Sequence, residues 1–476
     1  MTVLALANGA LAREPRIVSQ EKSTTKVSGR GECEAVLYRI EVPENRSNPE
    51  SNLIQLAVRQ VKSPNPDAGA PIFCLAGGPG GSSIQMARQS LFFDPALLDL
   101  GDIVGVDQRG IGKSTPRLIY DDIKFAIPYD QPGEPKSLLA IVEAAHKKAY
   151  ARLIEQGVDP AGYNTEESAD DIDAVRAVLG YESMRVIGGS YGSHLAFSLA
   201  RRHADTVDRV VVQSPEGPDH TFKRPGQIQE GLELLAARAS ENEQIRQHVP
   251  DLVGMLESVL ARLEKQPVYV EVEVPKSDRK QRIGVSKFDV QRLVASALGR
   301  NSSARNIPRL VYEMHQGDFT GAANVLVRFR GERTGVHAMG SLVDLASWAT
   351  DARFEQIKRE AETTVLGDAV DFPSYELADA WGRHLLDDDF RGPLDVAVPF
   401  LIIVGDLDAR TPPSNAREIL ASLPNGQMVT VTNGAHDFSI LLNKEARAVV
   451  HQFLAGEPVE IDQIVAPPVS FARIEK

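Results

Sequence analysis

Short, wholly apolar segments that alternate with helical patterns constrain this chain more than any other feature. They occur at residues 71–76 (PIFCLA), 103–107 (IVGVD), 185–189 (RVIGG), 209–213 (RVVVQ), 399–405 (PFLIIVG) and 428–432 (MVTVT). Runs of this length and composition are typical of strands that are buried on both faces of a parallel sheet. The alternation therefore predicts an α/β protein in which helices flank a mostly parallel central sheet.

The clearest helical pattern lies at residues 165–179 (TEESADDIDAVRAVL), where Thr165 is a plausible N-cap and Gly180 ends the helix. One apolar stripe runs along it, formed by Ala169, Ile172, Val175 and Leu179. Up to about residue 115 the chain is typical of strands and turns, and residues 53–61 (LIQLAVRQV) alternate as a half-buried strand does.

Residues 220–390 differ from the rest, because helical stretches dominate there and strand signals are few. The helical stretches lie at residues 251–264, 288–298 and 341–361, and the clearest strand lies at 268–274. We interpret this region as a mostly helical cap inserted between two strands of the sheet. The predicted organisation is an N-terminal segment, two parts of one core, and the cap between them: residues 1–30, 31–219, 220–390 and 391–476.

Composition excludes several classes of protein. The formal net charge of −13 argues against a nucleic-acid-binding protein, which needs a basic surface. The two cysteines, Cys33 and Cys74, are too few for a disulfide framework or a cysteine-based zinc cluster, and we expect neither a metal nor another cofactor. No segment has the ~18 apolar residues of a spanning helix, so we expect no membrane partner.

The N-terminal run MTVLALANGALA ends in Ala10-Leu11-Ala12, which has the shape of a signal cleavage site. It carries no Lys or Arg before the apolar stretch, which a signal peptide normally has. The run is interpreted either as the remnant of an export signal or as a frayed N-terminus. Localisation, cytoplasmic or exported, therefore stays open, as does the oligomeric state.

The motif that carries chemistry is the G-x-S-x-G at residues 188–192 (GGSYG), centred on Ser190. An apolar strand precedes it and an amphipathic segment follows it, which is the strand–turn–helix setting of a nucleophilic serine. A serine hydroxyl needs a base to take its proton, and an acid usually orients that base. Two loops that follow apolar strands offer them: Asp406 or Asp408 in GDLDARTPP, and His436 in NGAHDF.

An acyl-transfer site also needs hydrogen-bond donors for the oxyanion that forms. We predict the backbone N–H of Tyr191 as one donor and that of Gly78, in the loop AGGPGGS (76–82), as the other. The segment GIGKS (110–114) is similar to the end of a phosphate-binding loop. It is not one, because position 107 holds Asp where that motif requires Gly.

These motifs together resemble the proline iminopeptidase-like branch of the α/β-hydrolases, and especially its tripeptidyl aminopeptidase-like members. The resemblance covers residues ~30–455 and rests on ECEAVLYRIEVPEN (32–45), AGGPGGS (76–82), DQRGIGKS (107–114), GGSYGSHLA (188–196), GDLDARTPP (405–413) and NGAH (433–436). It implies an α/β-hydrolase fold with an inserted helical cap. It also implies Ser190 as nucleophile, His436 as base and Asp408 as acid, because the family acid precedes the pair Thr411-Pro412.

Three functions fit these residues. The first is an aminopeptidase that releases residues from peptide N-termini through an acyl-enzyme, with Glu216 in SPEGPD (214–219) as the candidate that binds the substrate ammonium. The second is an esterase or amide hydrolase that acts on a small molecule, since fold and triad do not define the leaving group. The third is a non-catalytic binding protein that has kept the fold.

Overall fold

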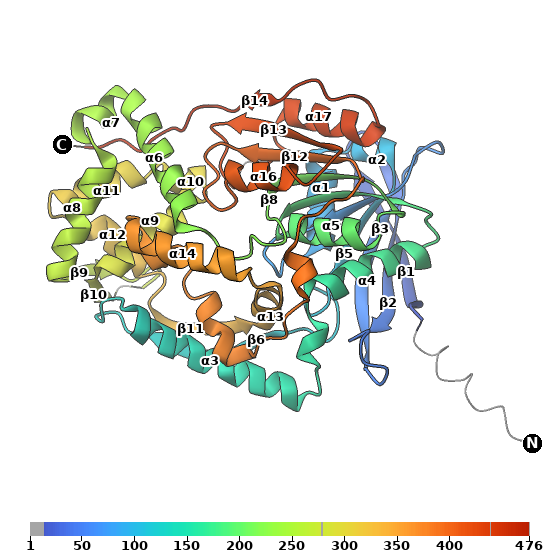
Figure 1. Cartoon of the computed structure of the whole chain (residues 1–476), viewed down its shortest axis with the longest axis horizontal. Helices are drawn as coiled ribbons and strands as arrows, with labels where there is room; N and C mark the ends of the chain where they lie inside the picture. Colours follow the sequence, from blue (N-terminus) through green and yellow to red (C-terminus); the bar gives the residue numbers. More distant parts are fainter. Residues whose placement is uncertain (1–13, 278, 438, 476) are drawn as a thin grey trace, which may run out of the picture.

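The computed structural model describes residues 14–277, 279–437 and 439–475, and a ten-stranded sheet forms its centre (Figure 1). The strand order is β1-β2-β3-β5-β4-β7-β8-β12-β13-β14; the pairs β1–β2, β2–β3 and β3–β5 are antiparallel, and the others are parallel. The strand bounds are Arg16–Val27, Gly31–Pro43, Leu53–Val61, Ile103–Asp107, Ile72–Leu75, Met184–Ser190, Val207–Pro215, Phe400–Gly405, Gly426–Thr432 and Gln463–Val465, in spatial order. The predicted fold class is confirmed.

Helices cover both faces of this sheet, because its central strands carry apolar side chains on both sides. In β12, Phe400, Ile402 and Val404 face one hydrophobic core, and the residues between them face another. The first core contains residues of α4 (Thr165–Val178), α5 (Tyr191–Arg202) and α16 (Pro413–Leu420). The second contains residues of α1 (Ser83–Phe93), α2 (Leu97–Leu100) and α17 (Lys444–Ala455), together with the buried, unpaired Cys33 and Cys74.

Three local predictions are corrected. Residues 83–93 form helix α1 instead of strands and turns, because the parallel strands β4 and β5 need a crossover between them. The N-cap of α4 is Asn164, whose side chain accepts a hydrogen bond from the Glu167 N–H, and Thr165 is the first helical residue. Strand β3 is mostly buried, because it lies inside the sheet between β2 and β5.

The segment between β8 and β12 is mostly helical and has a third hydrophobic core, separate from the two that pack against the sheet. That core is formed mainly by α6 (Pro225–Glu241), α7 (Glu243–His248), α8 (Leu252–Lys265), α9 (Lys287–Leu298), α10 (Asn301–Ala304), α11 (Ile307–His315), α12 (Thr320–Leu326) and the hairpin of β9 (Val268–Glu273) and β10 (Lys280–Val285). The predicted helix at 341–361 is two helices, α13 (Ala338–Ser347) and α14 (Asp351–Thr363). They separate at Trp348, whose φ is 52°.

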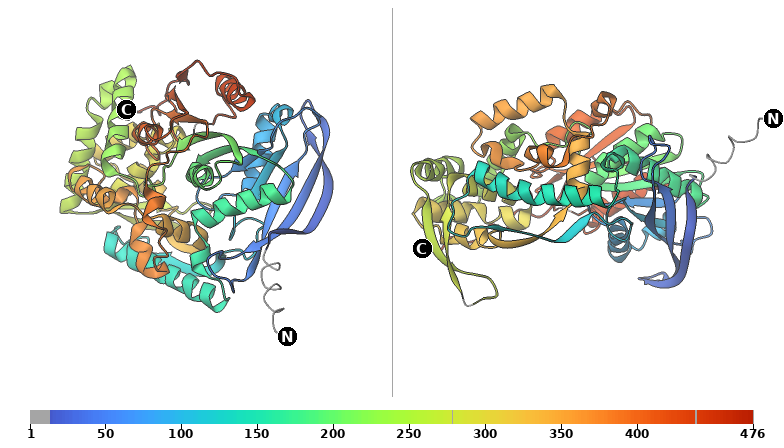
Figure 2. Two further views of the ribbon diagram at one scale, coloured as in Figure 1. Left: turned by 45° about the vertical axis from the view of Figure 1, so that its right-hand side comes forward. Right: turned by 90° about the horizontal axis from the view of Figure 1, so that it is seen from below.

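Two parts of the predicted core segments pack with elements of this inserted region. Strand β6 (Ile119–Ile127) pairs with β11 (Gly331–His337), and α3 (Pro135–Glu155) runs beside them along one side of the molecule (Figure 2). The chain beyond β14 returns to the inserted region: Ala472 N–H donates to the Arg305 carbonyl, and Ile474 is buried in the core of the inserted region. The remaining short helices are α15 (Ala378–Trp381), η2 (Pro160–Gly162), η3 (Gly367–Val370), η4 (Tyr375–Leu377) and η5 (Asp388–Arg391).

The predicted N-terminal segment 1–30 belongs in part to the core. Within it, residues 16–27 form strand β1 at the edge of the sheet. The signal-like run MTVLALANGALA lies outside the described residues. Among the helices of the described part of the chain, none combines the length and apolar character that crossing a bilayer requires.

Candidate active site

Ser190 lies at the turn from β7 to α5, in a backbone conformation that L-residues rarely adopt (φ 53°, ψ −129°). The two glycines of the motif make this turn sterically possible. A Cβ atom on Gly188 would lie 2.5 Å from the Gly192 carbonyl oxygen, and a Cβ on Gly192 would lie 2.0 Å from that of Leu75. Strain at a single non-glycine residue of this kind is characteristic of functional sites.

The loops after β12 and β13 bring an acid and a histidine to this serine. His436 Nε2 lies 3.1 Å from Ser190 Oγ, and His436 Nδ1 lies 3.0 Å from Asp408 Oδ2. Since an ionised carboxylate only accepts hydrogen bonds, the Nδ1 nitrogen carries the proton in this contact and Nε2 is left to accept one. The structure thus brings together the three residues that the resemblance singled out.

The Asp408 side chain is completely buried, whereas that of His436 keeps about a fifth of its surface exposed (21%). Burial alone would raise the pKa of Asp408, but the facing His436 and the hydrogen bonds from Thr411 and Ser214 outweigh it and lower the pKa below its ordinary value. The carboxylate therefore stays charged at neutral pH. Asp406, the other candidate acid, accepts a hydrogen bond from Asn433 N–H at 2.7 Å and pairs with Arg238.

The glycine-rich loop at residues 76–82 passes directly beside Ser190. A Cβ atom on Gly77 would lie 3.0 Å from the Ser190 Cβ, and the backbone of Gly78 has a φ of 131°. Tyr191, the residue after the serine, is the first residue of α5, where backbone N–H groups carry partial positive charge. Of the two residues predicted as oxyanion donors, Tyr191 follows the serine directly, and Gly78 follows Gly77, which contacts the serine.

Glu216 follows β8 and is buried against Lys223, whose Nζ lies 2.6 Å from Glu216 Oε2. Burial favours the neutral acid, but Lys223 outweighs it and lowers the pKa of Glu216. The structure therefore places the predicted ammonium-binding residue in an ion pair.

A second acid, the half-buried Asp344 of α13, was not predicted from the sequence. Burial, and then repulsion by Glu216, raise its pKa well above the ordinary value. Its carboxylate makes no hydrogen bond or ion pair with the described residues. One turn earlier on the same helix face, Gly340 faces Pro79 of the glycine-rich loop. The only sequence signal was a single acid in an otherwise apolar helix.

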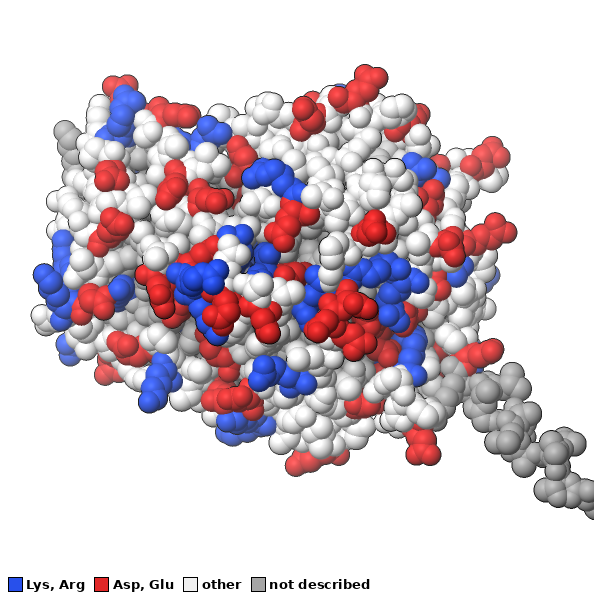
Figure 3. All heavy atoms as spheres, viewed as in Figure 1, with Lys and Arg blue, Asp and Glu red and all other residues white. Residues whose placement is uncertain are grey.

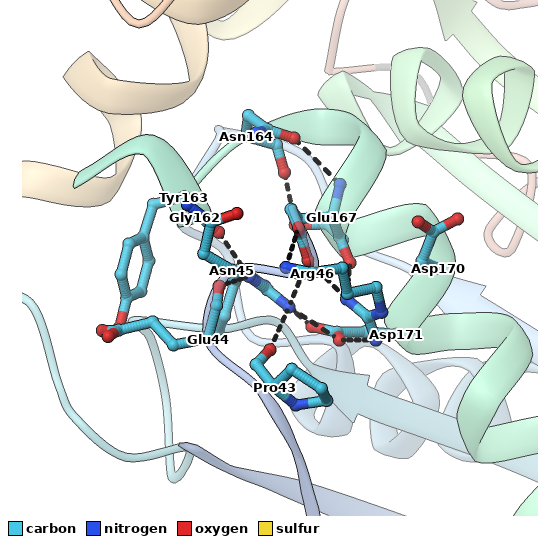
Figure 4. Close-up of polar contacts among 12 residues, drawn as sticks. Pro43, Glu44, Asn45, Arg46, Gly162, Tyr163, Asn164, Glu167, Asp170 and Asp171 are labelled. Carbon is cyan, nitrogen blue, oxygen red and sulfur yellow. Dashed lines mark hydrogen bonds and ion pairs between the residues drawn. The ribbon is translucent and has the colours of Figure 1, made fainter. Parts of the chain in front are cut away.

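A buried ionic network holds α4 against the sheet, and Figure 4 shows the residues around it. Arg109, from the DQRG segment, is fully buried and binds Asp171 through two hydrogen bonds of 2.8 and 2.9 Å. Arg46 contacts the same carboxylate at 2.7 Å. The hydroxyl of Thr165, the first residue of α4, lies 3.3 Å from the hydroxyl of Tyr191, the residue after Ser190. The network therefore holds in place a helix, α4, that contacts the residue next to the serine.

Within the described residues, no group of three or more His, Cys, Asp or Glu side chains is arranged to hold a metal ion.

A mostly parallel sheet with a half-buried serine at a sharp strand–helix turn, followed along the chain by an aspartate and a histidine in hydrogen-bond contact, defines the α/β-hydrolase class. The family model of the α/β hydrolase fold matches residues 70–442, and the chain belongs to this family. It is therefore a hydrolase by fold and relationship.

Curated relatives carry names from the branch that the motifs resemble. A tripeptidyl aminopeptidase of Streptomyces coelicolor is 29% identical over 38% of this chain and 35% of its own length. A proline iminopeptidase of Aspergillus aculeatus is 25% identical over 54% of this chain and 53% of its own length. A probable proline iminopeptidase of Leptolyngbya boryana is 30% identical over 35% of this chain and 36% of its own length. The resemblance is confirmed, although the match spans only about a third to a half of these relatives.

Solved structures align over most of the chain at low identity. A serine hydrolase from Cycloclasticus zankles is 13% identical, covers 92% of this chain and 99% of its own, and has a TM-score of 0.36. A thermophilic esterase from Thermogutta terrifontis is 15% identical, covers 92% of this chain and 98% of its own, and also has a TM-score of 0.36.

Proposed function

We propose that this protein is a serine hydrolase that releases residues from the N-termini of peptides. The observation that carries the proposal is the continuous contact from Ser190 Oγ through the His436 ring to the buried Asp408 carboxylate. In this proposal Ser190 is the nucleophile, His436 is the general base, and Asp408 orients the ring and stabilises its protonated form.

The reaction follows from the positions of these atoms. Ser190 Oγ attacks the peptide carbonyl carbon while its proton passes to His436 Nε2, and the oxyanion accepts hydrogen bonds from the N–H groups of Tyr191 and Gly78. His436 then returns the proton to the leaving amine, and an acyl-enzyme remains. Water, deprotonated by the same nitrogen, attacks the acyl carbon, releases the carboxylic acid and regenerates the serine hydroxyl.

The buried Glu216 and the half-buried Asp344 support a substrate that carries an ammonium group. Lys223 already compensates the charge of Glu216, whereas Asp344 lacks such a partner and has a raised pKa. A bound ammonium would supply the missing positive charge and allow Asp344 to ionise. Asp344 and Glu216 together are the proposed binding site for the peptide N-terminus.

The serine assignment is tested with a fluorophosphonate probe that labels activated serines. We expect labelling of the wild-type protein at Ser190 and none of Ser190→Ala, whose far-UV spectrum should match the wild type. Turnover retained in Ser190→Ala would refute the assignment. A wild-type protein that is not labelled would favour the non-catalytic binding protein.

The substrate class is tested with a panel of aminoacyl-arylamides, their N-acetylated forms and simple arylesters. An aminopeptidase should prefer the free amine, and Asp344→Asn should raise KM for it by about tenfold or more while N-acetylated substrates are little affected. Asp219→Asn is the matched control, because that carboxylate accepts hydrogen bonds from Thr350. Rapid ester turnover without arylamidase activity would instead identify an esterase.

A further inference from the structure

One residue of the inserted region, Asn301, contacts the histidine loop on both sides of His436. Its side-chain Nδ2 donates a hydrogen bond to the Asn433 carbonyl at 2.7 Å, and its backbone N–H donates to Asp437 Oδ1 at 2.9 Å. Asn433 and Asp437 are the first and last residues of the five-residue segment that contains His436. The base therefore lies in a short span whose two ends are held by the same residue.

Asp437 is bound to the beginning of α10 more extensively than this single bond. Its Oδ2 also accepts hydrogen bonds from the Ser302 N–H (3.4 Å) and Ser302 Oγ (3.2 Å). The residue at the N-cap position of α10, Arg300, makes no side-chain capping bond. Asp437, from the loop after β13, therefore supplies the carboxylate that usually comes from the helix's own N-cap residue.

The inserted region also contacts the acid loop, which is the loop after β12 that carries Asp406 and Asp408. Asp406 holds Asn433 N–H at 2.7 Å and also contacts Arg238 of α6 at 3.2 Å. The backbone at Asn433 has a φ of 62°, a conformation that side-chain and backbone contacts must maintain. A Cβ atom on Gly299 would lie 2.8 Å from Arg410 Cγ, so the chain just before α10 packs closely against the acid loop.

We propose that Asn301 and Asp437 are positioning residues, which keep the His436 ring aligned with Ser190 only while the helical region is seated on the catalytic loops. The proposal rests on the proposed function, since it takes His436 as the general base. Displacing a catalytic group by about 1 Å can lower a rate about 10²-fold, so a loosened loop affects turnover more than binding.

The test uses the full-length protein and the variants Asn301→Ala, Asp437→Ala and their combination. Asn306→Ala is the matched control, because its side chain bonds only to carbonyls of Ser302 and Ser303 inside the helical region. Steady-state kinetics are measured with a small arylester and with the preferred arylamide. The rate of fluorophosphonate labelling and the thermal midpoint are measured beside them.

We expect each single variant to lower kcat and the labelling rate about tenfold to a hundredfold with little change in KM, for the small ester as well. The double variant should lose at least as much as the worse single variant, because Asn301→Ala removes the side-chain bond to the Asn433 carbonyl, whereas Asp437→Ala removes the acceptor of the Asn301 N–H. Asp437→Asn keeps an acceptor oxygen for Asn301 N–H and should recover part of the loss. Asn306→Ala should behave as the wild type.

Unchanged kcat and labelling in both single variants would overturn the proposal, as would losses confined to KM. Equal activity at a temperature well below each thermal midpoint would also overturn it, because the contacts would then be purely structural. These results require a wild-type protein that labels at Ser190. Failure of that labelling would overturn the proposed function itself, so the two failures are distinguishable.

Discussion

Two aspartates only two positions apart have different surroundings, and this difference decides their roles. Asp408 faces His436 and receives further hydrogen bonds from Thr411, whereas Asp406 faces the backbone of Asn433. From the strand and loop pattern alone both were candidate acids. Only the resemblance favoured Asp408, because the direction of a loop side chain depends on its tertiary partners.

At this scale we predict a large difference between Asp408→Asn and Asp406→Asn. Asp408→Asn should lower kcat about 10⁴-fold, since an amide facing Nδ1 disfavours the tautomer in which Nε2 accepts the serine proton. Asp406→Asn keeps an oxygen for Asn433 N–H and should stay within about tenfold of the wild type. Steady-state kinetics with one substrate check both, and equal losses would contradict this assignment of the acid.

The turn between β7 and α5 shows what a local motif can and cannot predict at the scale of an element. The strand–turn–helix order was predictable, because the apolar run, the glycines and the amphipathic segment are all local signals. The close approach of Leu75 to Gly192 was not, because it joins the end of β4 to the start of α5, which are far apart in the sequence. Glu216 was predicted as a site residue without its partner Lys223, although the two are only 7 positions apart, because no regular pattern orients side chains in the loop between them.

We predict that Gly192→Ala is severely destabilising and that Gly189→Ala, three positions earlier in the same motif, is tolerated. The new Cβ at 192 would lie 2.0 Å from a backbone oxygen, whereas at 189 the nearest atom is the Gln213 carbonyl oxygen at 3.8 Å. We expect a loss of about 3 kcal/mol or more for the first and about 1 kcal/mol or less for the second. Urea unfolding measures both, and similar midpoints would contradict the argument.

On the scale of the whole molecule, the inserted helices and the sheet are joined by long-range contacts. Helix α3 packs against α15 at one such junction, where the Trp381 indole N–H donates to His146 Nδ1 at 2.8 Å. The acidic side chains that produce the net charge of −13 lie among basic ones over the face seen in Figure 3. We expect the free energy of unfolding to depend on pH through polar contacts of this kind more than through the surface charges.

We therefore predict that stability decreases as the pH falls from about 6.5 to 4. Burial lowers the pKa of His146 to about 4, against about 6.5 in an unfolded chain. Between these values the unfolded state binds a proton that the folded state does not, so stability is complete above this window and is lost below it. We expect a loss on the order of 1–2 kcal/mol from this group.

The control for this prediction is His146→Gln, which can still accept the Trp381 hydrogen bond through Oε1 but does not titrate. Its unfolding free energy should depend less steeply on pH than that of the wild type across this window. His220 contributes in the same direction, because burial also lowers its pKa to about 4. An equally steep profile for His146→Gln would show that His146 does not carry the effect.

The sequence by itself determined the strand–helix alternation, the family and the order of serine, aspartate and histidine along the chain. Side-chain period and steric preference are local properties, and they can be read without knowing what packs against them. The tertiary structure alone decided which aspartate meets His436, and it alone paired Glu216 with Lys223. It also brought Asn301 to Asp437, 136 positions away. Such pairings depend on how the chain returns on itself, which no local pattern specifies.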